Sequence, residues 1–160
     1  MVKFLGSLAL AAGLAVSASA GAATYDLGTL SSGVTQFGPT AVSGSFSDTI
    51  DFTIGSLSNL SAGVGALNFS LGSTPYFGIN NLNLTLYNSH NVDLGTGASI
   101  SLHDLAAGSY YAVITGKTYG IAGGEYGGAI SISAVPEAST LAMMLAGLGM
   151  LGYVASRRKV

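Results

Sequence analysis

The sequence contains no cysteine and no tryptophan, and only five of its 160 residues are lysine or arginine. Without cysteine the chain can form no disulfide, no thiol nucleophile, no cysteine-ligated zinc site and no iron–sulfur cluster. A folded domain in this chain therefore depends on its apolar core and its sheet hydrogen bonds.

Positive charge is scarcest in the middle of the chain. Residues 21–135 carry one basic residue, Lys117, against six acidic residues. Nucleic acids and anionic membrane surfaces are bound by clustered cations, which this segment lacks. We expect no nucleic-acid partner. The roughly 110 residues between the termini suffice for one domain.

Long apolar stretches occur only at the two ends. Residues 1–20 begin with the basic Lys3, continue with an apolar segment from Phe4 to Val16, and end with the small residues Ala18-Ser19-Ala20. This order is typical of a signal peptide, and it predicts a helical export signal that signal peptidase removes. Cleavage after Ala20 is the preferred site, with cleavage after Ala22 or Ala23 as alternatives.

The C-terminus, residues 135–160, also has three parts in order. Val135-Pro136-Glu137 precedes an uncharged segment of about residues 138–156, and the basic residues Arg157, Arg158 and Lys159 follow. Nineteen helical residues rise about 30 Å, which matches the hydrocarbon core of a bilayer. The apolar residues surround the helix, so it is predicted to span the membrane rather than cover a soluble core. The basic end should stay cytoplasmic.

This tripartite tail resembles the PEP-CTERM sorting signal of Gram-negative bacteria. Ala138 stands where the name motif Pro-Glu-Pro has its second proline. The resemblance implies processing by an exosortase, a membrane transpeptidase-like enzyme, near Pro136 and Glu137. It also implies a link to exopolysaccharide and biofilm production.

Residues 21–134 show the alternation of β-strands, with no convincing helical period. Phe46, Ile50, Phe52 and Ile54 share one face of the clearest strand, residues 46–54, and the carboxylate of Asp48 falls on that same face. Further strands are expected at 82–87, 98–102, 109–115 and 129–135, with two more within 55–71. Gly78, Asn80-Asn81, Gly95-Thr96-Gly97, Ala107-Gly108 and Gly123-Gly124 are expected to break them. The predicted fold is all-β: an antiparallel β-sandwich or jelly-roll-like body.

Two of these strands resemble family patterns. Phe46-x-Asp48-x-Ile50-x-Phe52 is similar to the opening strand of FxDxF-type PEP-CTERM proteins, with Ile50 in place of the second Phe. Residues 105–116 resemble an L-x-x-G-x-Y strand that also occurs in bacterial pre-peptidase-like β-sandwiches. The resemblance assigns no molecular role to the body.

No set of residues predicts catalysis, and we expect neither an enzyme nor a cofactor. His90 and His103 belong to no metal or catalytic motif, and they are expected to be structural or solvated. A bare carboxylate on an apolar face is costly, so Asp48 should either accept backbone hydrogen bonds or bind calcium. The Asn-x-Ser/Thr sequences at Asn59, Asn68 and Asn83 are weak glycosylation signals.

The functional expectation is therefore an exported protein, anchored at first in the inner membrane with its body in the periplasm, and then placed at the cell surface or in the extracellular matrix. The alternative is a carbohydrate-binding adhesion module, with ice binding as a variant. Such a module would use loop Asn and Asp residues and an exposed face of tyrosines, among them Tyr76, Tyr87, Tyr110 and Tyr111.

Overall fold

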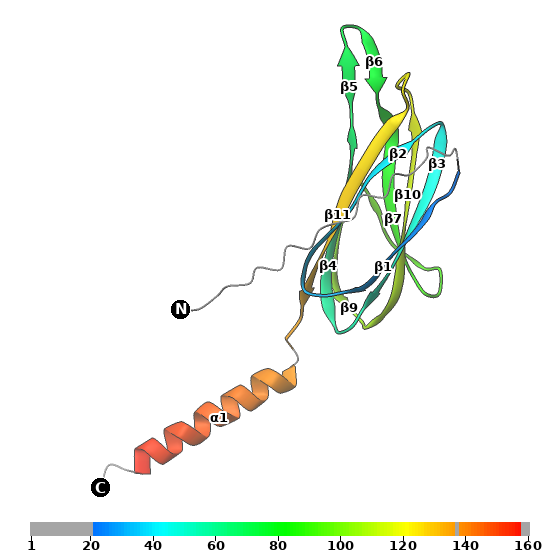
Figure 1. Ribbon diagram of the computed structural model, residues 1–160. Coiled ribbons are helices and arrows are strands. Elements are labelled where there is room, and N and C mark those ends of the chain that lie inside the picture. The colour runs from blue at the N-terminus through cyan, green and yellow to red at the C-terminus, as the bar shows by residue number, and fades with distance from the viewer. Residues whose placement is uncertain (1–20, 137, 158–160) are drawn as a thin grey trace, which may run out of the picture.

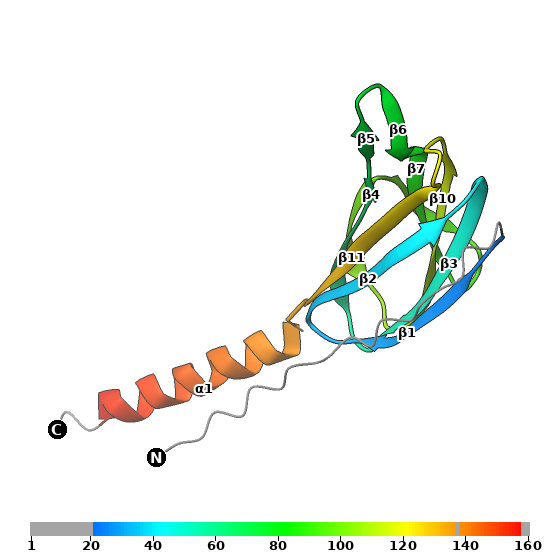
Figure 2. The same cartoon turned by 45° about the horizontal axis from the view of Figure 1, so that its top comes forward.

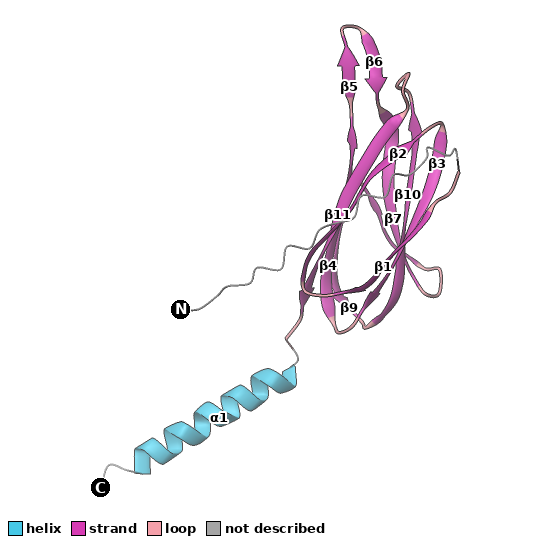
Figure 3. Cartoon of the chain, viewed as in Figure 1, coloured by secondary structure: helices cyan, strands magenta, loops and turns pink. Residues whose placement is uncertain are grey.

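The computed structural model describes residues 21–136 and 138–157 (Figure 1). Its elements are eleven strands and one helix, coloured by type in Figure 3. They are β1 (Thr24–Leu30), β2 (Gly33–Val42), β3 (Ser45–Ile54), β4 (Ser58–Leu67), β5 (Phe69–Leu71), β6 (Thr74–Phe77), β7 (Ile79–Asn88), β8 (Asp93–Gly97), β9 (Ser99–Leu105), β10 (Gly108–Thr118), β11 (Gly124–Ala134) and α1 (Ala138–Arg157).

The strands form two main sheets. The five-stranded sheet has the order β1-β3-β10-β7-β8, and the four-stranded sheet has the order β2-β11-β4-β9. A two-stranded hairpin, β5-β6, projects from one end (Figure 1). Every neighbouring pair is antiparallel except β1 and β3, which run parallel. The predicted all-β sandwich is confirmed, with this one parallel pair as a difference.

Both sheets contribute alternate side chains to a single core. In β3 the even-numbered residues from Phe46 to Ile54 are buried, as the period-2 pattern predicts. Leu84, Leu86 and Ile114 add wholly enclosed side chains from the same sheet. The opposite sheet contributes, among others, Phe37, Leu60, Ile100, Tyr126, Ile130 and Ile132. Burial of these apolar surfaces holds the two sheets together.

The expected strands are confirmed: 46–54 lies in β3, 82–87 in β7 and 109–115 in β10, and the two within 55–71 are β4 and β5. Those expected at 98–102 and 129–135 are β9 and β11, each apart from one terminal residue, Ala98 and Val135. Two expected breaks are wrong. Gly95-Thr96-Gly97 lies in β8, where its backbone pairs with β7. Asn80 and Asn81 lie in β7, and Asn81 takes a φ of 54° beside the register shift between β7 and β10. That shift has the character of a β-bulge, which bends a strand without ending it.

The helix α1 stands clear of the sandwich in both views (Figures 1 and 2). Three residues, Val135, Pro136 and Glu137, separate it from the end of β11 at Ala134. The predicted signal helix, residues 1–20, lies outside the described residues.

Candidate functional site

The junction between the sandwich and α1 contains the predicted sorting residues. The backbone N–H of Val135 donates a 3.0 Å hydrogen bond to the carbonyl oxygen of Leu57, just beyond the end of β11. Pro136 is exposed and has no N–H with which to extend the sheet. Glu137 lies outside the described residues. The sheet thus ends at Val135, and Pro136 is accessible in the link to the helix.

The helix α1 has the length and composition of a membrane span. Its 20 residues correspond to a rise of about 30 Å. The 18 residues Thr140–Arg157 have a mean hydropathy of 1.2, and none of that stretch is buried against the rest of the described protein. Exposed Leu, Met and Val side chains all round a helix are stable in lipid but costly in water.

The cationic end of α1 begins with Arg157. Its guanidinium lies 5.2 Å from the ring centroid of Tyr153, in cation–π geometry. A tyrosine beside an arginine at the end of a span is the kind of pair that sits at a membrane–water interface. The predicted basic residues Arg158 and Lys159 lie outside the described residues, as do Ala18 and Ala20 of the predicted signal cleavage site.

The family-like strand residues Phe46, Asp48 and Phe52 are all buried in β3. Oδ2 of Asp48 accepts a 2.6 Å hydrogen bond from the hydroxyl of Tyr126, and Oδ1 accepts a 2.8 Å bond from the backbone N–H of Ala23. The ring of Tyr126 also stacks on Phe46, with centroids 5.3 Å apart. Both carboxylate oxygens therefore have protein donors, which corresponds to the structural reading of Asp48 rather than the calcium reading.

The surroundings of Tyr126 hold its phenol in the neutral form. Burial raises the pKa of Tyr126 far above 10, and its hydrogen bond to the Asp48 carboxylate raises the pKa further. Tyr126 is not among the residues that the sequence patterns single out. Tyr126 lies an even number of residues before Ile130 and Ile132 in the same strand, and this spacing places all three side chains on the buried face. That alternation is the sequence signal that could have identified it.

A row of acidic and aromatic side chains crosses the outer face of the five-stranded sheet. The backbone register places in one line, from β1 to β8, Asp26, Asp51, Tyr111, Tyr87 and Asp93. We call this set the tyrosine–aspartate row. Its two rings are stacked with centroids 5.0 Å apart, and the Tyr111 hydroxyl donates a 3.0 Å hydrogen bond to Oδ1 of Asn91.

A shallow depression of about 300 Å³ adjoins this row. It is lined in part by Asp26, Asp51, Ser109 and Tyr111. Tyr110 also lines this depression, but neither Tyr110 nor Tyr76 belongs to the row. Tyr110 points inward, where it stacks on Phe52 at 6.0 Å, and Tyr76 is exposed on the hairpin. Of the four tyrosines, only Tyr87 and Tyr111 form a joint outer surface.

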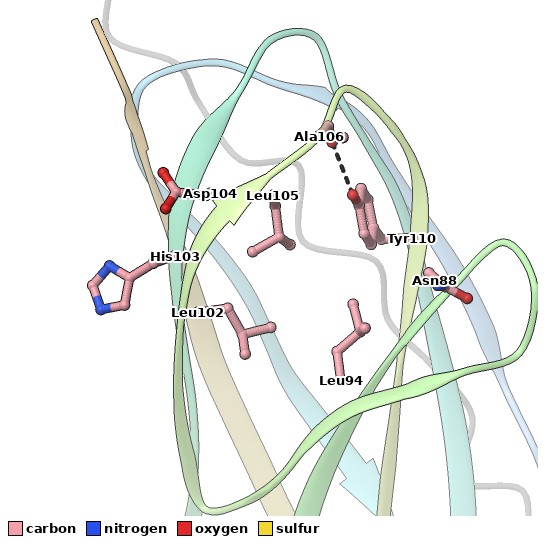
Figure 4. A pocket seen from close by; sticks show the side chains of 8 residues that line it. All are labelled: Asn88, Leu94, Leu102, His103, Asp104, Leu105, Ala106 and Tyr110. Atoms are coloured by element: carbon pink, nitrogen blue, oxygen red, sulfur yellow. Dashed lines mark hydrogen bonds between the residues drawn. The ribbon is translucent and has the colours of Figure 1, made fainter.

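A second depression, of about 290 Å³, opens at the β8–β9 side of the sandwich (Figure 4). Leu94, Leu102 and Leu105 form its floor, and the Tyr110 hydroxyl donates a 2.8 Å hydrogen bond to the carbonyl oxygen of Ala106 at its rim. The imidazole of His103 points away from it. His103 and His90 are both exposed, and the described residues contain no group of three or more metal-ligating side chains.

Together, the sandwich and the exposed apolar helix define a folded β-domain carried on a C-terminal membrane segment. The comparisons specify that segment: residues 134–159 match the PEP-CTERM protein-sorting motif. The chain carries this signal, which exosortase-type processing recognises. The match confirms the tail resemblance, and its bounds differ by one residue at each end from the predicted tail, residues 135–160. The FxDxF likeness of β3 stays a prediction.

No curated protein matches the chain in sequence. Two solved structures are similar to it. The periplasmic inhibitor of g-type lysozyme PliG from Aeromonas hydrophila has a TM-score of 0.40 at 16% identity, over 70% of this chain and 99% of its own. The pre-peptidase C-terminal domain of collagenase from Bacillus anthracis has a TM-score of 0.36 at 15% identity, over 69% and 94%. Both likenesses are distant.

Proposed function

We propose that this chain is a non-catalytic surface or matrix protein. Residues 1–20 export it, α1 holds it in the inner membrane with its sandwich (residues 21–134) in the periplasm, and an exosortase-type enzyme then cuts near Pro136 and Glu137. The freed body remains at the cell surface or joins an extracellular exopolysaccharide matrix. The basic residues Arg157, Arg158 and Lys159 stop transfer at the cytoplasmic side.

The exposure of the apolar side chains of α1 is the main support for this proposal. Its apolar side chains from Leu141 to Val154 are exposed, and the sandwich covers none of them. A helix of this kind needs lipid. The body meanwhile has a closed core of its own, so removal of the tail leaves a complete domain.

Mass spectrometry of the extracellular protein tests the proposal. The expected C-terminal peptide ends near Pro136 or Glu137, and Glu137→Gln should reduce its yield, whereas Leu148→Ile should not. Recovery of the full-length chain from the soluble cytoplasm would contradict both export and sorting.

A second candidate function, glycan binding, is favoured by the tyrosine–aspartate row. Stacked tyrosines offer apolar ring surface with polar hydroxyls, and flanking carboxylates accept hydrogen bonds from sugar hydroxyls. Lys117, the only base of the body, pairs across the sheet with Ser45 and Asn80, several residues from this row. Neutral polysaccharides therefore suit the row better than acidic ones.

A glycan array with the purified exported protein tests this candidate. We expect binding to a neutral polysaccharide that Tyr111→Ala and Tyr87→Ala each weaken about tenfold, which corresponds to roughly 1.4 kcal/mol. The matched control is Tyr76→Ala on the hairpin, and it should leave binding unchanged. Equal loss in all three variants, or no binding to any glycan, rejects the candidate.

A further inference from the structure

The buried carboxylate of Asp48 has only neutral donors in the described protein. Asp48 is 2% exposed, and its two hydrogen-bond partners in the described protein are the Tyr126 hydroxyl and the Ala23 backbone N–H. Lys117, the one base between residues 21 and 136, is exposed on the outer face of β10. An ionised carboxylate in a core is costly unless an opposite charge compensates it. A cation beside Asp48 would compensate this charge, and neither of its two hydrogen-bond donors carries one.

Ala23 is where the chain enters the sandwich. Gly21 and Ala22 are exposed, whereas Ala23 is half-buried. Its N–H donates to Asp48, and its carbonyl oxygen accepts a 2.7 Å hydrogen bond from the Thr49 N–H. Ala23 is therefore held by β3 through both backbone groups, and the two residues before it make no comparable contact among the hydrogen bonds of the described region.

The sequence before Ala23 offers a second signal-peptidase site. Ala20-Gly21-Ala22 has small residues at the same two positions as Ala18-Ser19-Ala20. Building on the export signal proposed above, we propose that signal peptidase cuts between Ala22 and Ala23, and that the new α-ammonium group of Ala23 forms an ion pair with Asp48. In the cut, water gives its hydroxyl to the Ala22 carbonyl carbon, which leaves as a carboxylate. The nitrogen of Ala23 takes the protons and becomes an ammonium.

The two other sites give no such pair. A cut after Ala20 places the ammonium on Gly21, which is exposed, and leaves a neutral N–H at Asp48. A cut after Ala23 removes both the donor to Asp48 and the acceptor of the Thr49 N–H. Only the cut after Ala22 turns the existing 2.8 Å contact into a contact between opposite charges.

This pair links processing to folding. The unprocessed chain keeps a buried carboxylate with neutral donors, so its body is less stable than the processed one. Removal of the signal supplies the missing charge after the chain has crossed the membrane. The sandwich then reaches its full stability only in the periplasm.

The ion pair has a defined pH dependence. The ammonium faces the Asp48 carboxylate on β3. In the described protein the titratable group bonded to that carboxylate is Tyr126 from β11, and Tyr25 from β1 lies close enough to Tyr126 to influence its phenol. An α-amino group in an unfolded chain titrates near pH 8. Pairing with Asp48 raises the pKa of the group in the folded state. Its stabilisation is therefore complete below about pH 8 and is lost as the pH rises through the higher folded value.

Two signal variants separate the cut sites. Ala18→Phe blocks the cut after Ala20 and leaves Ala20-Gly21-Ala22 intact, whereas Ala22→Phe blocks the cut after Ala22 and leaves Ala18-Ser19-Ala20 intact. N-terminal peptide mass spectrometry of the exported wild-type chain and of Ala18→Phe should find Ala23 first. Ala22→Phe should begin at Gly21.

Urea unfolding of the same exported chains between pH 7 and pH 10 then tests the pair. In the chains that begin at Ala23, the folding equilibrium constant should fall about tenfold or more over this range, since one unit of pKa shift corresponds to a factor of ten. The Gly21 chain and Asp48→Asn in the wild-type background should both lack this fall. A wild-type N-terminus at Gly21, or the same fall in all chains, overturns the inference alone. A wild-type N-terminus at Met1 overturns the export signal as well.

Discussion

The hydroxyl of Tyr126 lies 2.6 Å from Oδ2 of Asp48 in the middle of the sandwich. The two residues come from different sheets, because Asp48 belongs to β3 and Tyr126 to β11. With Tyr126 1% exposed and Asp48 2% exposed, water has little access to either group. This bond fixes the relative position of the sheets at one point, where apolar contacts alone would permit sliding.

Tyr126→Phe should destabilise the protein because it leaves Oδ2 of Asp48 buried without its donor. The expected loss is about 1.5–3 kcal/mol, the usual range for a hydrogen bond to a charged group. Urea unfolding at pH 7 measures it. Tyr76→Phe removes the same hydroxyl from the exposed hairpin and should change stability by less than about 0.5 kcal/mol. Equal effects of the two variants would mean that the buried bond adds nothing.

Alkaline pH should destabilise the protein through the same tyrosine. The pKa of Tyr126 in the folded state is raised, first by burial, above the ordinary value of 10.0. Above pH 10 the unfolded chain loses the phenol proton while the folded chain retains it, so stability falls as the pH rises. Urea unfolding from pH 9.5 to pH 11.5 should show a steeper fall for the wild type than for Tyr126→Phe. Parallel curves would show that Tyr126 does not contribute.

Two glycines of the four-stranded sheet should respond in opposite directions to alanine. A Cβ on Gly128 would overlap the carbonyl oxygen of Gly63 and the ring of Phe37, so Gly128→Ala should cost about 1–3 kcal/mol by overpacking. A Cβ on Gly65 would meet nothing within 4 Å. Gly65→Ala should be neutral or stabilising by roughly 0.5–1 kcal/mol, because it restricts the unfolded chain. Thermal unfolding of both variants measures the difference, and a stable Gly128→Ala would require a different packing between β2, β4 and β11.

A charge in the middle of α1 should release the protein from the membrane. Leu148→Asp adds about 2.5–3.5 kcal/mol to the cost of insertion at the helix centre. In a host without an exosortase, alkaline carbonate should extract this variant from the membrane fraction. The conservative variant Leu148→Ile should stay in the pellet with the wild type. Equal retention of Leu148→Asp would argue that α1 does not anchor the chain.

The strands that the sequence predicts best are those with strict alternation. In β3, β7 and β10, apolar and β-branched residues recur at every second position, and one face of each strand fills the core. The strand β2 gives no such signal. It contains Gly33, Gly38 and Pro39, which read as turn residues, although Gly38 with its φ of 82° lies at the register shift between β2 and β11. The strand β2 forms because it pairs with β11, which is distant in the sequence, and the local sequence pattern does not predict it.

The sorting tail could be predicted fully from local order, because its parts are contiguous. The polar groups of the body could be predicted only in part. Alternation alone placed Asp48 on the apolar face of its strand, but its partner Tyr126 is 78 residues away. The tyrosine–aspartate row likewise depends on the register of five strands, and the parallel pairing of β1 with β3 is invisible to a pattern read along the chain.

The strand that leads into the anchor is an interior one. In the four-stranded sheet β11 lies between β2 and β4, antiparallel to both, and it ends beside Ser58, while the β5–β6 hairpin lies at the opposite end, beyond Leu67 (Figure 2). A pull on the anchor therefore acts along β11 and loads the hydrogen bonds on both of its sides at the same time. Such bonds fail together in shear rather than one after another, as they would if an edge strand were peeled away. The architecture thus gives a domain tethered through α1 a mechanically strong attachment.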